Sequence, residues 1–145
     1  MSPDSIFSLC SSLAMFGWVI LIVASPFWRS ADKFLIGIVI TLLAIVYAWC
    51  IGQSFHPDDF QKFGTLDGVM SLFTNKMAVT AGWVHYLAFD LMVGIWIKKN
   101  AEKYAISHWV LIPCLFFTFM MGPIGLLLYL LVRFIKTKHY FADNY

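Results

Sequence analysis

The chain has 145 residues, of which 61% are hydrophobic and 12% are charged. The charged share is about half of that in ordinary soluble domains, and the apolar residues gather in runs too long for a soluble domain of this size to bury. The net charge is only +2 and no basic face recurs along the chain, which argues against a nucleic-acid partner. We therefore predict one membrane-embedded domain covering residues 1–145.

Two apolar runs near the N-terminus predict a pair of antiparallel membrane helices. The first covers about residues 6–28 and carries small residues that favour close helix contact. No basic segment precedes it and it is long for the core of a signal peptide, so we expect a retained helix. The second covers about residues 34–51 and ends in an interfacial aromatic belt of Tyr47 and Trp49. The turn between them is too short for anything but an antiparallel return.

The long connection at residues 52–75 predicts a short helix lying in the membrane interface. Thr65 or Asp67 lies near the start of this helix, and Thr74 or Asn75 is placed to cap the next span. One side of the helix carries its apolar residues, Leu66, Val69, Met70, Leu72 and Phe73.

The third predicted span, about residues 77–97, carries two polar side chains that need an explanation. About 20 helical residues are enough to cross the ~30 Å hydrocarbon layer. His85 and Asp90 lie near the centre of this run, where a carboxylate costs roughly 2.5–3.5 kcal/mol even on the more lenient insertion scale. We therefore expect Asp90 to be hidden inside the bundle and paired.

Four residues of this span, Gly82, Tyr86, Asp90 and Gly94, recur every fourth position and form one stripe. The glycines are expected to let another helix approach and seal Asp90 and Tyr86 from lipid. His85 stands about 140° around the helix from Asp90, so the two cannot bond side by side, although they can flank a ligand. A protonated Asp90 and a neutral His85 suit a general acid and a general base. Hydrogen bonds that set helix register, and an ion or proton path, are the competing interpretations.

The fourth predicted span covers about residues 108–132 and includes Pro113 and the segment Gly122-Pro123-Ile124-Gly125. Each proline removes a helix hydrogen bond, so kinks are expected near both. Residues 133–145 predict a basic, then aromatic, surface tail. This arrangement places five Lys or Arg on each side of the membrane, which leaves the orientation open. The predicted fold is all-α, a four-helix membrane bundle with an interfacial helix between the second and third spans.

The residues themselves predict no cofactor. Only His85 among the histidines lies at membrane depth, whereas a haem held by two histidines needs a pair there. The three cysteines lie inside apolar runs without CxxC spacing, which is typical of core positions. The polar residues of the long connection match no known metal-ligand spacing and predict a solvated acidic loop: His56, Asp58, Asp59 and Asp67.

Aromatic residues make up 18% of the chain, more than interfacial belts require. Trp83 and Phe89, on the third span, are candidates to line a slot for a long, flat apolar molecule. Ordinary helix packing is the competing interpretation.

The chain resembles the membrane proteins called abscisic-acid-deficient 4-like, or neoxanthin-synthase-like. The resemblance rests on Met77-Ala78, on Gly82-Trp83-Val84-His85-Tyr86-Leu87-Ala88-Phe89-Asp90-Leu91 and on Gly94. Pro113-Cys114, Thr118 and Gly122-Pro123-Ile124-Gly125-Leu126-Leu127-Leu128-Tyr129 extend it, and Phe7-Ser8-Leu9 with Gly17-Trp18 gives a weaker echo. We expect no plastid transit segment like that of the plant members, and the chain resembles their bacterial relatives. This implies a bacterial inner, or photosynthetic, membrane.

The resemblance implies a role in xanthophyll metabolism, with a carotenoid or another isoprenoid lipid as substrate or bound ligand. The plant relatives are needed to convert violaxanthin to neoxanthin, in which an epoxide end ring opens to an allenic alcohol. By our inference Asp90 delivers a proton to the epoxide oxygen, His85 removes one from a neighbouring carbon, and Tyr86 steadies the oxygen. The candidate ligand-binding residues are Trp83, Phe89, Gly82, Gly94, Thr118, Gly122 and Pro123.

Two other functions stay open at this stage. One is a non-catalytic pigment- or lipid-binding subunit of a larger membrane complex or homo-oligomer. The other is a small proton-coupled transporter, which the single intramembrane acid and the lack of an inverted repeat make the weaker of the two.

Overall fold

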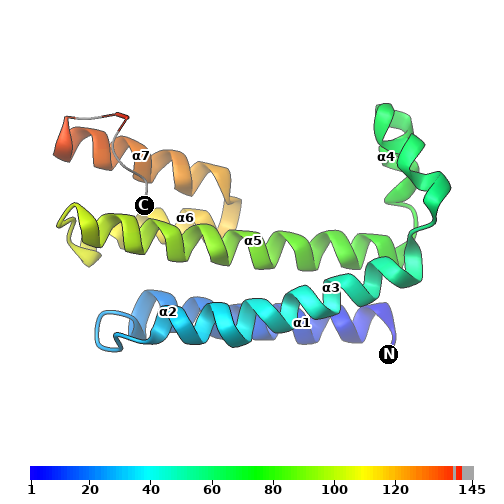
Figure 1. The fold of residues 1–145 in the computed structure, drawn as a ribbon, viewed down its shortest axis with the longest axis horizontal. Coiled ribbons are helices and arrows are strands. Elements are labelled where there is room, and N and C mark those ends of the chain that lie inside the picture. Colours follow the sequence, from blue (N-terminus) through cyan, green and yellow to red (C-terminus); the bar gives the residue numbers. More distant parts are fainter. Residues whose placement is uncertain (139, 142–145) are drawn as a thin grey trace.

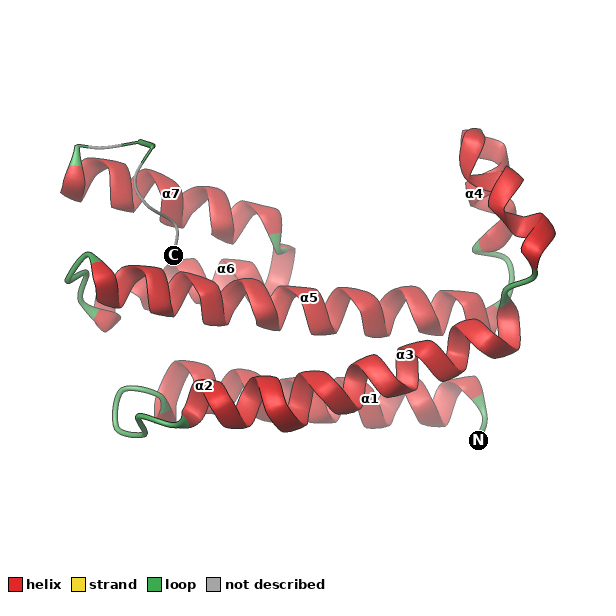
Figure 2. Ribbon diagram, viewed as in Figure 1, coloured by secondary structure: helices red, strands yellow, loops and turns green. Residues whose placement is uncertain are grey.

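The computed structural model describes residues 1–138, 140 and 141, and every regular element in this part of the chain is a helix (Figures 1 and 2). In this described part of the chain, three helices are long and apolar enough to cross a membrane: Pro3–Ala24, Ala31–Ser54 and Lys76–Lys103. They lie side by side in alternating directions (Figure 1). The chain is therefore an integral membrane protein, as predicted. The last part of the predicted surface tail, residue 139 and residues 142–145, lies outside the described residues.

The first two long helices each change their winding part of the way along. α1 (Pro3–Val19) continues as the π-helical segment η1 (Ile20–Ala24). The second long helix consists of α2 (Ala31–Phe34), the π-helical η2 (Leu35–Ile40) and α3 (Thr41–Ser54). Both correspond to the first two predicted spans.

The third long helix, α5 (Lys76–Lys103), lies at the centre of the molecule and packs against α1, α3, α6 and α7. Close contact depends on two glycines. A Cβ on Gly17 of α1 would lie 2.9 Å from Leu91 of α5, and one on Gly94 of α5 would lie 2.7 Å from the Trp18 ring. Gly94 therefore admits α1, as expected for the glycine stripe. Gly82 instead faces Phe73 of the preceding loop.

The C-terminal part corrects the sequence prediction, because residues 108–132 do not form one kinked span. α6 (His108–Met121) ends at Gly122, and α7 (Pro123–Thr137) runs back beside α6 and α5 (Figure 1). Gly122 has φ +36°, a conformation that L residues with a side chain rarely adopt, and a proline suits the first position of the next helix. Pro113 lies inside α6 without ending it.

The reversal produces a re-entrant hairpin instead of a fourth crossing. At about 1.5 Å per residue, the 14 residues of α6 extend about 21 Å, less than the ~30 Å hydrocarbon layer. A Cβ on Gly125 would overlap the backbone nitrogen of Thr118, so this glycine lets α7 contact the backbone of α6. The described architecture is three long helices and a half-length hairpin, not a four-helix bundle.

Buried polar side chains hold together the end of the molecule that carries the 25–30 turn. Lys98 of α5, 4% exposed, donates to both carboxylate oxygens of Asp32 at 3.0 and 3.2 Å. Asn100 of α5 accepts hydrogen bonds from Tyr129 at 2.6 Å and Arg133 at 2.8 Å, both on α7. These contacts tie the second long helix, α5 and the hairpin to one another.

At the other end of the molecule, two short helices project to one side of the long ones (Figure 1). They are η3 (Pro57–Gly64), a 3-10 helix, and α4 (Leu66–Leu72). The predicted short helix and its caps are confirmed: Thr65 accepts from the Gly68 nitrogen at 3.1 Å, and Asn75 accepts from the Met77 nitrogen at 2.8 Å. Every residue of α4 is at least partly exposed, as an interfacial helix requires.

Candidate functional site

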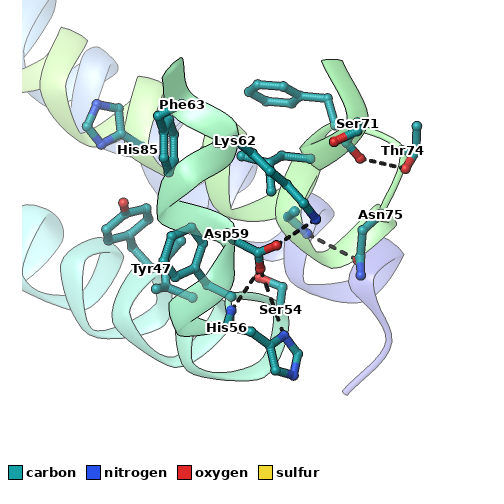
Figure 3. A pocket seen from close by; sticks show the side chains of 16 residues that line it. Tyr47, Ser54, His56, Asp59, Lys62, Phe63, Ser71, Thr74, Asn75 and His85 are labelled. Carbon is teal, nitrogen blue, oxygen red and sulfur yellow. Dashed lines mark hydrogen bonds and ion pairs between the residues drawn. The ribbon is translucent and has the colours of Figure 1, made fainter. Parts of the chain in front are cut away.

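A cleft of about 540 Å³ opens where α3, η3, the end of α4, the 73–75 loop and the first turns of α5 meet (Figure 3). Aromatic rings form much of its wall: Tyr47, Phe55, Phe63 and Phe73. Polar side chains that also line it include Ser54, His56, Asp59, Lys62, Asn75 and His85. The cleft therefore combines apolar surface with groups that can bind or transfer a proton.

His85 reaches this cleft from α5 and lies close to Tyr47 of α3. The centroids of their rings are 5.6 Å apart, and His85 also stacks on Phe89 at 4.5 Å. Figure 3 shows His85, Tyr47 and Phe63 together on one side of the cleft. Gly82, one turn before His85, keeps this region open, because a Cβ there would lie 3.2 Å from the Phe73 ring.

The other side of the cleft carries an ion pair. Lys62 contacts Asp59 Oδ1 at 2.7 Å, and the backbone nitrogen of His56 donates to Asp59 Oδ2 at 2.8 Å (Figure 3). The hydrogen bond from the Lys62 ammonium holds the pKa of the Asp59 carboxyl below its ordinary value. Asp59 is therefore ionised at neutral pH, and the pair marks the polar rim of the cleft.

A second polar cluster lies on a different face of α5, against the tip of the α6–α7 hairpin. The Tyr86 hydroxyl donates towards the carbonyl oxygens of Met120 at 3.1 Å and Phe119 at 3.4 Å. Asp90 is 9% exposed, and a Cβ on Gly122 would lie 2.5 Å from its Oδ1 atom. Among the described residues its Oδ2 atom has no hydrogen-bond partner. Asp90 is buried, as the sequence predicts, but the predicted ion-pair partner is not found among the described residues.

The structure does not bring His85 and Asp90 together. His85 faces α3 and the cleft, whereas Asp90 and Tyr86 face the hairpin. The predicted ligand-binding residues separate in the same way. Gly82 lines the cleft and Phe89 stacks on its histidine, while Gly122 and Pro123 form the hairpin turn.

Three other predicted site residues take part in helix packing. Trp83 donates from Nε1 to the Ser11 hydroxyl at 2.9 Å and stacks on Phe7, so it faces α1. Gly94 packs against Trp18, and Thr118 donates to the Cys114 carbonyl oxygen within α6. These contacts place all three outside the cleft.

Sequence reasoning missed the cleft residues that come from outside α5. In the sequence, Tyr47 looks like a residue of an interfacial aromatic belt. Asp59 and Lys62 look like residues of a solvated loop. A signal was present in the loop itself, where aromatic and charged residues alternate over a few positions: Phe55, Asp59, Phe60, Lys62 and Phe63. As for metals, the described residues gather no group of three potential His, Cys, Asp or Glu ligands.

The fold and the two sites define an integral membrane protein with three long helices, a re-entrant hairpin and a cleft at one end. A family model described as ABA DEFICIENT 4-like matches residues 5–129, and the chain belongs to this family. The match includes Tyr47, the 52–75 connection, His85 and Asp90 of α5, and the hairpin turn. This confirms the resemblance drawn from the sequence motifs. Neither a curated protein nor a solved structure matched the chain.

Proposed function

We propose that the protein acts on the polar end group of a carotenoid-like isoprenoid that enters the cleft from the bilayer. The observation that carries this proposal is the composition of the cleft, which joins an aromatic wall to a polar rim at one end of the long helices. Phe89, 60% exposed and stacked on His85, continues the apolar surface along α5. A long polyene has this pattern, with a polar ring at its end and an apolar chain suited to lipid.

His85 and Tyr47 are the side chains best placed for an isomerisation of an epoxide end ring. In that reaction a base takes a proton from the chain carbon beside the ring, and the released electron pair forms the new double bond to the ring carbon. The C–O bond of that ring carbon breaks, and the oxygen, still held by the other ring carbon, takes a proton from an acid. Reactant and product are isomers, so no oxidant is needed.

We assign the base to His85 and the acid to the Tyr47 hydroxyl. Their ring centroids, 5.6 Å apart, allow both to reach one bound end group. Pairing His85 with Asp90, as the sequence predicts, would require a single ligand to contact two faces of α5. The resemblance to the neoxanthin-synthase-like proteins supports a carotenoid as the substrate class, and we propose a bacterial inner or photosynthetic membrane as the location.

The test uses purified protein in liposomes that contain an epoxy-carotenoid, with products separated by chromatography and identified by mass. His85→Gln and Tyr47→Phe are each expected to reduce the conversion rate at least about 100-fold, the lower bound for losing one acid or base. Binding, followed by quenching of tryptophan fluorescence, is expected to persist in both variants. Trp109→Phe, at an 80% exposed position beyond the cleft, is the matched control and should keep the full rate.

Three results would revise the proposal. Full conversion by His85→Gln would exclude His85 as the base. Loss of conversion in Asp90→Asn, with Tyr47→Phe still active, would restore the sequence-based choice of Asp90 as the acid. Binding without conversion by the wild-type protein would identify a pigment- or lipid-binding subunit, alone or in a larger complex.

A further inference from the structure

The tip of the α6–α7 hairpin gathers oxygen atoms around Asp90. The carbonyl oxygens of Phe119 and Met120 end α6, where the helix dipole places partial negative charge. Tyr86 lies one turn before Asp90 on α5, and its hydroxyl donates towards these two carbonyls. Asp90 Oδ2 is buried without a partner among the described residues. The site is electronegative on several sides.

The hairpin turn provides no free backbone N–H at Gly122 or Pro123 that could stabilise a negative charge on Asp90. The Gly122 nitrogen donates to the Thr118 carbonyl oxygen at 2.8 Å, and Pro123 has no N–H to donate. No ion pair to Asp90 occurs among the described residues. On its own helix, Tyr86 is the titratable group that faces Asp90.

Titratable groups on the helices packed around Asp90 make their contacts elsewhere. On α6, the Cys114 thiol contacts the Val110 carbonyl oxygen, and the His108 ring contacts the Ile22 carbonyl oxygen. On α7, Tyr129 and Arg133 donate to Asn100 at the end of the molecule that carries the 25–30 turn. On the first two long helices, Asp4 pairs with Lys76, Asp32 with Lys98, Tyr47 contacts His85, and Cys10 and Cys50 are buried.

We propose that Asp90 is a proton-binding site within the membrane, and that the bound proton holds the hairpin against α5. The Tyr86 hydroxyl has one hydrogen to donate, and two backbone carbonyls accept it. No hydrogen of Tyr86 is then left for the Asp90 carboxyl, whose Oδ2 atom is buried without a donor among the described residues. The neutral acid is the form that such a site holds at the lower free-energy cost, and this assignment is independent of the proposed function.

Loss of this proton should loosen the hairpin. A carboxylate would lie at Gly122, next to the negative end of the α6 dipole, without a positive partner among the described residues. The contact with Gly122 also leaves it no room for a hydration shell while the tip stays packed. The packed hairpin is therefore favoured at low pH and opens as the pH rises. For one coupled proton, the ratio of open to packed hairpin increases about tenfold per pH unit between the Asp90 pKa of the open state and that of the packed state.

The experiment follows hydrogen exchange of peptides from residues 108–137 in lipid nanodiscs across pH. Rates are normalised to a peptide of α1 to remove the intrinsic pH dependence of exchange. The wild-type hairpin is expected to exchange faster above a midpoint pH, at constant sodium concentration. Asp90→Asn, which keeps the shape but cannot ionise, should remain protected at every pH. Asp59→Asn, which removes a carboxyl of the cleft rim, should keep the wild-type profile.

Two outcomes would overturn the proposal: a wild-type profile as flat as that of Asp90→Asn, or protection that depends on sodium at constant pH, which would assign a metal cation instead. If Asp90→Asn fails to fold, infrared spectroscopy of the wild-type protein provides the second test. The proposal requires the carbonyl band of a protonated carboxylic acid that Asp90→Glu shifts and that disappears as the hairpin opens. Absence of this band while the hairpin is protected would contradict it.

Discussion

Gly122 determines the path of the last third of the chain, because its backbone conformation turns α6 back into α7. Gly122→Ala should destabilise the protein by about 1–3 kcal/mol, the cost of a side chain at a strained φ, with an added clash against Asp90. Thermal unfolding in a mild detergent measures this loss. Gly52→Ala is the matched control, since a Cβ there meets nothing within 4 Å. Equal stability of the two variants would show that the turn does not depend on glycine.

Lys98 illustrates a second requirement at the residue scale, the neutralisation of a buried charge. Lys98→Met leaves the Asp32 carboxylate, 7% exposed, without its main partner, and should cost about 3–5 kcal/mol in unfolding free energy. Lys99→Met is the control, because Lys99 is 57% exposed and lies 4.0 Å from Asp32, a contact worth at most about 1 kcal/mol. If the two variants unfold alike, the buried pair does not stabilise the fold.

The sequence indicates these residues only in part. Asp90 and His85 can be recognised because a polar group in an apolar run is costly wherever the chain folds. Their partners depend on which helix packs against each face of α5. The 3.6-residue repeat predicts that His85 and Asp90 lie on different faces, but it does not predict which helix covers each face. Lys98 and Asn100 read as a polar link after the third span, because nothing in the local pattern shows that Asp32 and Tyr129 approach them.

At the scale of elements, η3 depends on the Asp59–Lys62 contact at the cleft rim. The pKa of Asp59 is lowered by this contact, so the associated stabilisation is complete above the ordinary carboxyl pKa of about 3.9 and is lost as the pH falls through the lower folded value. A spin label at Gln61→Cys should be immobile at neutral pH and become mobile in acid. Adding Asp59→Asn should abolish the pH dependence; persistence of the transition would assign it to another group.

The elements show why three long helices could be predicted and the hairpin could not. Length and hydropathy are sufficient to predict an uninterrupted membrane span. The residue preferences of helix N-termini are sufficient to predict the caps at Thr65 and Asn75. Residues 108–132 have the length of one span, and a Gly-Pro pair is compatible with either a kink or a reversal. The positive φ of Gly122 and the contact at Gly125 decide between them, and both are tertiary features.

At the scale of the whole molecule, the hairpin changes the distribution of charge across the membrane. It brings the basic residues at the end of α7 to the same side as the 25–30 turn. That side then carries eight Lys or Arg: Arg29, Lys33, Lys98, Lys99, Lys103, Arg133, Lys136 and Lys138. The cleft side carries two, Lys62 and Lys76. The positive-inside rule therefore predicts that the cleft opens away from the compartment in which the protein is made.

The most direct test of the re-entrant hairpin is to determine on which side of the membrane each of its two ends lies. Single cysteines at Gln61, Ser107 and Lys138 are treated with a membrane-impermeant maleimide in intact cells and after lysis, while the three native cysteines are buried. We predict that Gln61→Cys reacts in intact cells, and that Ser107→Cys and Lys138→Cys react only after lysis. Reaction of Lys138→Cys together with Gln61→Cys would mean a fourth crossing and would contradict the re-entrant hairpin.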